Sequence, residues 1–130
     1  MAVNTQKLAE KIFNLLKGYG YAVKSYDAEG KLVVNPQEAT RFLVDDPNVL
    51  VRLDLNNMQV SLATSEDLSN DPLRTQLKKI VYNTSPELTF DYKVFGKKLK
   101  AKGEAINIIK NSEKDMADVM EGFGTMTGST

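Results

Sequence analysis

The chain has 130 residues, of which 42% are hydrophobic and 26% charged, and its 17 basic and 17 acidic side chains cancel. This length suits one ordinary globular domain, and the composition argues against wholesale disorder. Cysteine and histidine are both absent, which excludes disulfides, cysteine nucleophiles, Ser–His–Asp triads and metal sites built on thiolate or imidazole ligands.

The first predicted element is a helix over residues 5–17, capped by Asn4 or Thr5 and ended by Gly18. Its apolar residues recur at the spacing of one buried stripe, and they are Leu8, Ile12, Leu15, Leu16 and Tyr19. Residues 21–26 and 31–34 then indicate two paired strands. The turn between them, residues 27–30, ends in Gly30, which is free to take a positive φ.

Two later segments open with a capping residue followed by proline. Asn35 and Pro36 predict a short helix to about Val44, which must end before Pro47. The same signal predicts a helix over residues 72–84.

Residues 49–55 and 58–62 alternate apolar and polar side chains, and they predict a β-hairpin. Asn56 and Asn57 favour a tight turn there, because asparagine tolerates the left-handed region. Residues 88–94 predict a further strand, broken at Gly96.

The remaining residues give weaker patterns. Residues 97–102 suit a strand or a basic loop, and residues 105–109 suit a strand or a helix. A capping box at residues 112–115 precedes one helical face, made of Met116, Val119, Met120 and Phe123. We therefore expect one domain over residues 1–121, with residues 122–130 as a flexible tail or a linker to a downstream region.

These elements predict an α+β fold, in which a mostly antiparallel sheet carries two to four helices. One parallel connection also fits the pattern, from the strand at 58–63 through helix 72–84 to the strand at 88–95. Such a crossover would be right-handed.

Charge is unevenly distributed along the chain. Residues 27–71 hold nine acids and three bases, whereas residues 78–102 hold seven lysines and two acids. The two segments either form opposite faces or cancel when the chain folds.

A lysine-rich stretch with interleaved aromatic residues is the candidate nucleic-acid site. It consists of Lys93, Lys97, Lys98, Lys100 and Lys102, with Tyr92 and Phe95. Single-strand binders use lysines for phosphates and aromatic rings for base stacking. Three arginines and a pI near 6.3 argue against a dedicated nucleic-acid binder, and the alternative is a solvated face whose aromatic rings belong to the core.

Two acidic patterns are candidates for a catalytic site or a metal-binding site. Asp91 and Lys93, with Asp54 on a neighbouring strand, match part of a metal-dependent nuclease site, or they simply face solvent. Asp45 and Asp46 resemble a fragment of a cation loop, or they end a helix through hydrogen bonds in the turn. Neither pattern is complete, so we expect no catalytic residue, no resident metal and no cofactor.

Four stretches in combination carry a family resemblance: residues 19–21, 34–42, 46–51 and, above all, Phe90-Asp91-Tyr92-Lys93-Val94-Phe95-Gly96-Lys97-Lys98-Leu99. Together they resemble the N-terminal region of a family of uncharacterised proteins of large contractile-tailed phages, notably those infecting marine cyanobacteria. The resemblance implies a virion-associated phage protein of which this chain is an N-terminal part. It implies no active-site residue.

We therefore expect a non-catalytic interaction or structural module, with other phage proteins or further copies of itself as partners. No stretch reaches the ~18 apolar residues of a membrane span, and charged residues in the first helix exclude a signal peptide. The expected location is the host cytoplasm or the virion, with no membrane and no small-molecule substrate. The alternative function is a nucleic-acid-binding domain that uses residues 93–102.

Overall fold

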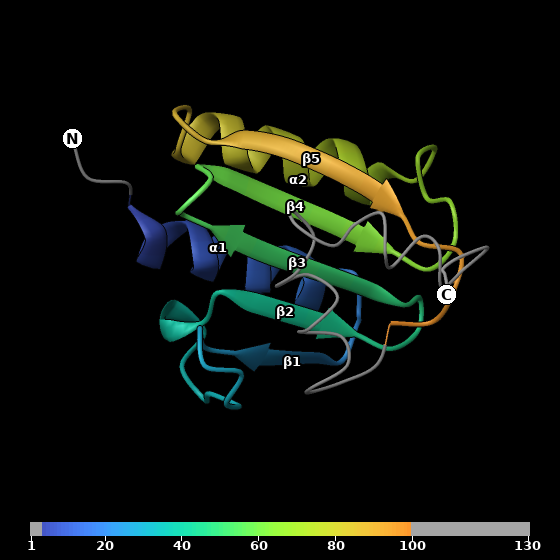
Figure 1. Cartoon of the computed structure of the whole chain (residues 1–130), viewed down its shortest axis with the longest axis horizontal. Coiled ribbons are helices and arrows are strands. Elements are labelled where there is room, and N and C mark those ends of the chain that lie inside the picture. Colours follow the sequence, from blue (N-terminus) through green and yellow to red (C-terminus); the bar gives the residue numbers. More distant parts are fainter. Residues whose placement is uncertain (1–3, 100–130) are drawn as a thin grey trace.

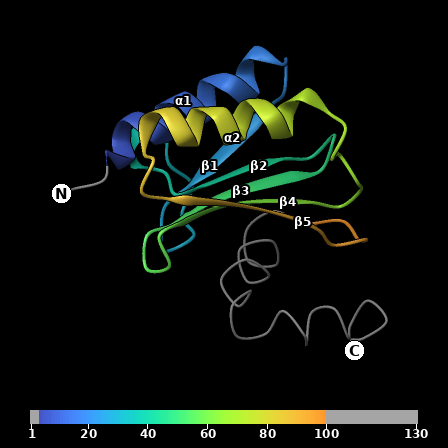
Figure 2. The ribbon, with the colours of Figure 1, turned by 90° about the horizontal axis from the view of Figure 1, so that it is seen from above.

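In the computed structural model, which describes residues 4–99, five strands form one sheet and both α-helices lie on the same face of it (Figures 1 and 2). The elements are α1 (Thr5–Gly18), β1 (Val23–Tyr26), the 3-10 turn η1 (Pro36–Glu38), β2 (Arg41–Val44), β3 (Val49–Asp54), β4 (Gln59–Thr64), α2 (Pro72–Thr84) and β5 (Thr89–Val94). Strands β1 to β4 pair antiparallel in chain order, and β5 pairs parallel with β4. The predicted α+β class, with a mostly antiparallel sheet, is confirmed.

The predicted helices over residues 5–17 and 72–84 form where their caps place them. The side chain of Asn4 accepts a hydrogen bond from the Lys7 amide at 3.1 Å, and that of Asp71 accepts from the Leu73 amide at 2.8 Å. These bonds satisfy amide groups that a helix start leaves without partners. The buried stripes of the two helices consist of Leu8, Ala9, Ile12 and Leu16 on α1, and of Leu73, Leu77 and Val81 on α2.

The main core lies between these stripes and the near face of the sheet. Every second residue of a strand points to the same face. The strand residues in this core include Phe42, Val44, Val49, Val51, Leu53, Val60 and Leu62. Alternation in β3 and β4 therefore gives one apolar face, as the hairpin pattern predicts.

The parallel crossover from β4 to β5 is also present. Gln59 pairs with Thr89 at one end of the two strands, and Thr64 pairs with Val94 at the other. In Figure 1 both strands run in the same direction and α2 lies behind them, which makes the connection right-handed.

Residues 36–44 do not form the predicted helix. The side chain of Asn35 does cap a turn, but that turn is only η1, and the chain then enters β2. All four β2 residues are buried, and β2 pairs with β1 on one side and β3 on the other. Pairing on both edges and burial on both faces outweigh a local helix signal.

The predicted strand over residues 31–34 is wrong as well. This segment keeps only a single bridge, from Leu32 to Tyr26, on the edge of β1 that β2 does not occupy. The side chains of Leu32 and Val34 are exposed and gain no burial from a longer pairing. Gly30 does take the predicted positive φ, at 86°. In the later hairpin the left-handed residue is Met58 rather than either asparagine.

The predictions for residues 100–130, including Lys100, Lys102 and the tail, lie outside the described residues. Within residues 4–99, no helix has both the length and the hydropathy needed to cross a membrane.

Candidate functional site

The sheet face opposite α1 and α2, here called the far face, carries the charged strand residues. The strand register aligns Tyr26 with Arg41, Arg41 with Arg52, Arg52 with Ser61, and Ser61 with Asp91. These five residues form one row across the face, because directly paired residues point to the same side of a sheet. Two arginines therefore stand side by side.

Arg41 is held in a nearly buried position, with 6% of its surface exposed. Its Nη1 donates to the carbonyl oxygen of Asp27 at 3.0 Å and to Oγ1 of Thr40 at 3.2 Å. Its Nε is buried and makes no hydrogen bond in the described part of the chain. Burial, and then the charge of Arg52, lower the pKa of Arg41.

Arg52 and its neighbours form a polar group at the end of β3. Arg52 Nη2 lies 3.6 Å from Oδ2 of Asp54, whose side chain is 4% exposed. Asn57 donates to the same carboxylate, from its side-chain Nδ2 at 2.9 Å and from its backbone amide at 3.3 Å. The hairpin turn thereby fixes the carboxylate that faces Arg52.

A pocket of about 470 Å³ opens beside the two arginines, and it is here called the sheet-end pocket. Its described lining consists of Ala28, Thr40, Arg41, Arg52, Leu53, Asp54, Leu55, Asn56 and Asn57. The lining joins the turn after β1, the start of β2 and the β3–β4 hairpin. Polar and charged groups therefore meet apolar ones at one end of the sheet.

Exposed apolar side chains gather in the two loops at this end. Leu32 and Val34 are 64% and 101% exposed, and Leu55 and Met58 are 42% and 39% exposed. The loop after β1 and the β3–β4 hairpin both lie at the end of the sheet where β2 begins (Figures 1 and 2). These four side chains and the sheet-end pocket are together called the sheet-end patch.

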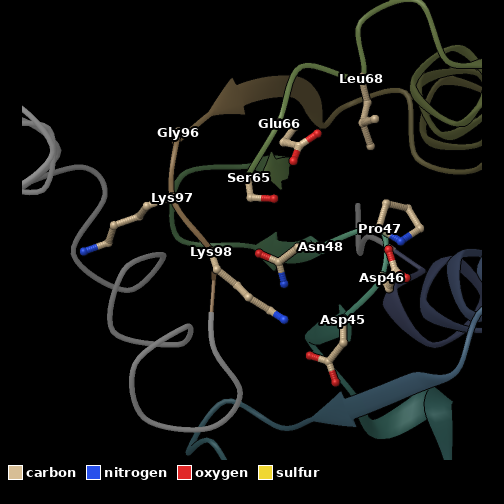
Figure 3. A pocket seen from close by; sticks show the side chains of 10 residues that line it. All are labelled: Asp45, Asp46, Pro47, Asn48, Ser65, Glu66, Leu68, Gly96, Lys97 and Lys98. Atoms are coloured by element: carbon tan, nitrogen blue, oxygen red, sulfur yellow. The ribbon is translucent and has the colours of Figure 1, made fainter.

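The described lysines of the predicted nucleic-acid site, Lys93, Lys97 and Lys98, lie at or beyond the end of β5, at the opposite end of the sheet from the sheet-end patch. Lys93 Nζ is 3.7 Å from Oδ2 of Asp91. Lys97 and Lys98 line a pocket of about 450 Å³ whose lining also contains three acids, Asp45, Asp46 and Glu66. In Figure 3 Lys98 extends across this pocket toward the side of Asp45, whereas Lys97 points away from it. Residues of the basic and the acidic segment thus line the same pocket. This is the arrangement expected if the charges of the two segments cancel when the chain folds.

The two aromatic residues of that stretch have structural contacts. Phe95 is 2% exposed. The Tyr92 hydroxyl accepts from the Leu68 amide at 2.6 Å and lies 3.2 Å from Oγ1 of Thr64. The guanidinium of Arg74 lies over the Tyr92 ring, 5.5 Å from its centroid. Burial of Phe95 and the contacts of Tyr92 leave little ring surface for a stacked base.

The two acidic patterns separate in the fold. Asp54 pairs with Gln59 and Asp91 pairs with Ser61, so the strand β4 lies between the two carboxylates. Each has a basic neighbour on its own strand, Arg52 or Lys93. Asp45 and Asp46 lie in the pocket of Figure 3. Across residues 4–99, no group of three or more acidic side chains could hold a metal ion.

Sequence reasoning missed the arginine pair because it placed Arg41 in a helix. The sequence does contain a signal for the position of Arg52, because this residue alternates with the apolar residues of its strand. Had residues 41–44 been assigned to the neighbouring strand, the same alternation would have placed Arg41 opposite Arg52.

Comparison of the chain with protein-family models, curated proteins and solved structures gives no match.

Proposed function

We propose that this chain is a non-catalytic interaction module that binds a polypeptide segment of a partner at the sheet-end patch. The observation that carries the proposal is the grouping of four exposed apolar side chains at the end of the sheet that also holds a pocket with two arginines. Protein interfaces are enriched in Met and Arg and combine apolar contacts with a few fixed polar groups.

The resemblance to phage proteins supports a partner among other phage proteins, or a second copy of the chain. A virion-associated role follows from the same resemblance and is part of the proposal. Both the host cytoplasm and the virion suit a module of this kind.

Selection from a random-peptide display library tests the proposed surface. We expect the selected peptides to shift amide resonances of residues 28–34 and 53–58. Their affinity should fall about tenfold or more in a Val34→Ser, Leu55→Ser double variant, because each lost apolar anchor removes roughly 1 kcal/mol. Both side chains are exposed, so the fold should survive.

Tyr82→Ser provides the matched control, because Tyr82 is 72% exposed but lies on α2. This variant should leave peptide affinity unchanged. Peptides that bind elsewhere, or a library that yields no binder, would contradict the proposal.

The alternative, a nucleic-acid-binding domain that uses residues 93–102, has weaker support because Phe95 is buried and Lys93 pairs with Asp91. Affinity of such a domain would fall steeply with salt as neutralised phosphates release counterions. Submicromolar, salt-dependent DNA binding that disappears when Lys97, Lys98 and Lys100 are reversed to Glu would favour this alternative.

A further inference from the structure

We infer that the outer edge of β5, the edge away from β4, pairs with the same edge of a second copy of the chain. The two strands run antiparallel about a two-fold axis at Tyr92, and they join two five-stranded sheets into one continuous sheet. This edge contains none of the residues of the sheet-end patch, so the contact goes beyond the proposed function and does not depend on it.

The two edge strands, β1 and β5, lie at opposite borders of the sheet and differ in how the chain covers them (Figure 1). Beside β1, the following segment supplies a bridge from Leu32 to Tyr26 and a hydrogen bond from the Val33 amide to the Ser25 carbonyl at 2.9 Å. Within residues 4–99, no strand or bridge pairs with the outer edge of β5, which is six residues long. An uncovered edge of this kind presents backbone groups with which a further strand can pair.

The hydrogen bonds at the two ends of β5 show which of its backbone groups face outward. The Thr89 amide donates to the Met58 carbonyl at 3.0 Å, and the Phe95 amide donates to the Thr64 carbonyl at 2.9 Å. Successive residues of a strand direct their N–H and C=O groups to alternate sides, so the odd-numbered residues of β5 face β4. The residues whose backbone groups face outward are therefore Phe90, Tyr92 and Val94.

A two-fold axis at Tyr92 gives each of these outward groups a partner. Tyr92 then exchanges two hydrogen bonds with the partner's Tyr92, and Phe90 does the same with the partner's Val94. The pairing also places the half-buried Phe90 ring beside an apolar side chain, that of Val94, which is 38% exposed in the single chain. Apolar cross-strand pairs of this kind stabilise a sheet.

The charges of β5 on the far face are complementary in the same register. Asp91 and Lys93 lie side by side, with Oδ2 and Nζ 3.7 Å apart and side chains 34% and 48% exposed. With the axis at Tyr92, Asp91 stands directly opposite the partner's Lys93, and Lys93 stands opposite the partner's Asp91. These are non-hydrogen-bonded pairs, in which side chains lie closest, and opposite charges there stabilise the pairing.

The neighbouring registers are disfavoured by the same two arguments. An axis at Asp91 sets two carboxylates opposite each other, and an axis at Lys93 sets two lysines opposite each other, which destabilises the sheet in both cases. The first of these also leaves the outward groups of Val94 without a partner in β5, and the second leaves those of Phe90. Since a two-fold contact uses each β5 edge once, the assembly is a closed dimer.

Sedimentation equilibrium of the full chain tests the dimer. We expect a monomer–dimer equilibrium with a dissociation constant of roughly 10–100 μM, because a contact along one strand edge is smaller than a standard interface. Asp91→Lys and Lys93→Asp should each raise this constant about tenfold or more, because each sets like charges opposite each other on both sides of the axis. A chain that stays monomeric at about 500 μM would overturn the inference.

Mixing the two variants tests the register itself. In a mixed dimer of Asp91→Lys with Lys93→Asp, every directly opposite pair is again one acid and one lysine, so association should return to the parent level. Lys24→Asp is the matched control, because it makes the same charge change as Lys93→Asp at an exposed position of the other edge strand. An equal loss of association in Lys24→Asp, or a mixture that stays monomeric, would overturn the inference.

Amide hydrogen exchange of the unaltered chain locates the contact without any substitution. The amides of Phe90, Tyr92 and Val94 should exchange more slowly as the protein is concentrated, because the second copy then accepts their hydrogen bonds. The amides of Asp91 and Lys93 face β4 and should exchange at the same rate at every concentration. Protection that rises at residues 53–58 instead would place the second copy at the sheet-end patch. That result would overturn the β5 contact and leave the proposed function standing.

Discussion

The side-chain amide of Asn48 pairs with the main chain of Leu99 much as a neighbouring strand would. Its Nδ2 donates to the Leu99 carbonyl at 2.7 Å, and its Oδ1 accepts from the Leu99 amide. Both residues are buried, with 8% and 0% of their surfaces exposed. Asn48 lies in the turn between β2 and β3, so the pairing fixes the chain beyond β5 to the middle of the sheet.

Asn48→Ala should lower the free energy of unfolding by about 1–3 kcal/mol, because it leaves the buried Leu99 amide and carbonyl without these partners. Urea denaturation measures the change. Asn56→Ala, at an exposed position of the β3–β4 hairpin, should stay within about 0.5 kcal/mol of the parent. Similar losses in the two variants would show that the Asn48–Leu99 pairing adds no stability.

Tyr92→Phe should destabilise the segment between β4 and α2, because the Tyr92 hydroxyl accepts from the Leu68 amide at 2.6 Å. We expect a loss of about 1–2 kcal/mol and faster hydrogen exchange at Leu68. Tyr82→Phe removes a hydroxyl from an exposed ring and should change neither quantity. Unchanged exchange at Leu68 in Tyr92→Phe would contradict this role of the hydroxyl.

The pKa of Asp67 lies below its ordinary value of 3.8, chiefly because the Ser69 hydroxyl and amide donate to its carboxylate, with further help from the Tyr92 hydroxyl and Arg74. A lowered folded-state pKa gives stability that is complete above the ordinary value and is lost as the pH falls through the lowered one.

Ser69→Ala should therefore raise the pKa of Asp67 toward 3.8, as measured by nuclear magnetic resonance titration. The acid-side decline of stability should become shallower in the same variant. Ser61→Ala, which removes a hydroxyl from the middle of β4, should leave the Asp67 titration unchanged. A pKa of Asp67 that is the same in Ser69→Ala and the parent would refute the hydrogen-bond explanation.

Met58→Gly should stabilise the hairpin. Met58 has a φ of 51°, where a side chain costs roughly 1 kcal/mol and glycine fits without strain. We expect a gain of up to about 1 kcal/mol, seen as a rise in the thermal midpoint. Leu55→Gly, in the same loop, should be neutral or destabilising. An equal gain in stability in Leu55→Gly would show that the positive φ of Met58 is not the cause.

Local signals predicted most of the fold. The caps at Asn4 and Asp71 and the alternation in β3 and β4 needed no information from distant residues. The errors lie between residues 31 and 44, where a proline-led cap indicates a helix but strand pairing on both sides decides the outcome. Arg41 was missed for that reason, since only the register places it opposite Arg52. The burial of Phe95 also depends on contacts that the lysine-rich pattern does not contain.

The parallel pairing of β4 with β5 has a consequence for the order of folding. In the β3–β4 hairpin, Asp54 meets Gln59 across a short turn, whereas Gln59 meets Thr89 only after the whole of α2 has been traversed. Closing the longer loop costs more chain entropy, and this cost arises before the contacts between β4 and β5 can stabilise the pair. The antiparallel meander should therefore form first and β5 should dock last. Substitutions in the hairpin would then slow folding, and substitutions at the β4–β5 contact would mainly speed unfolding.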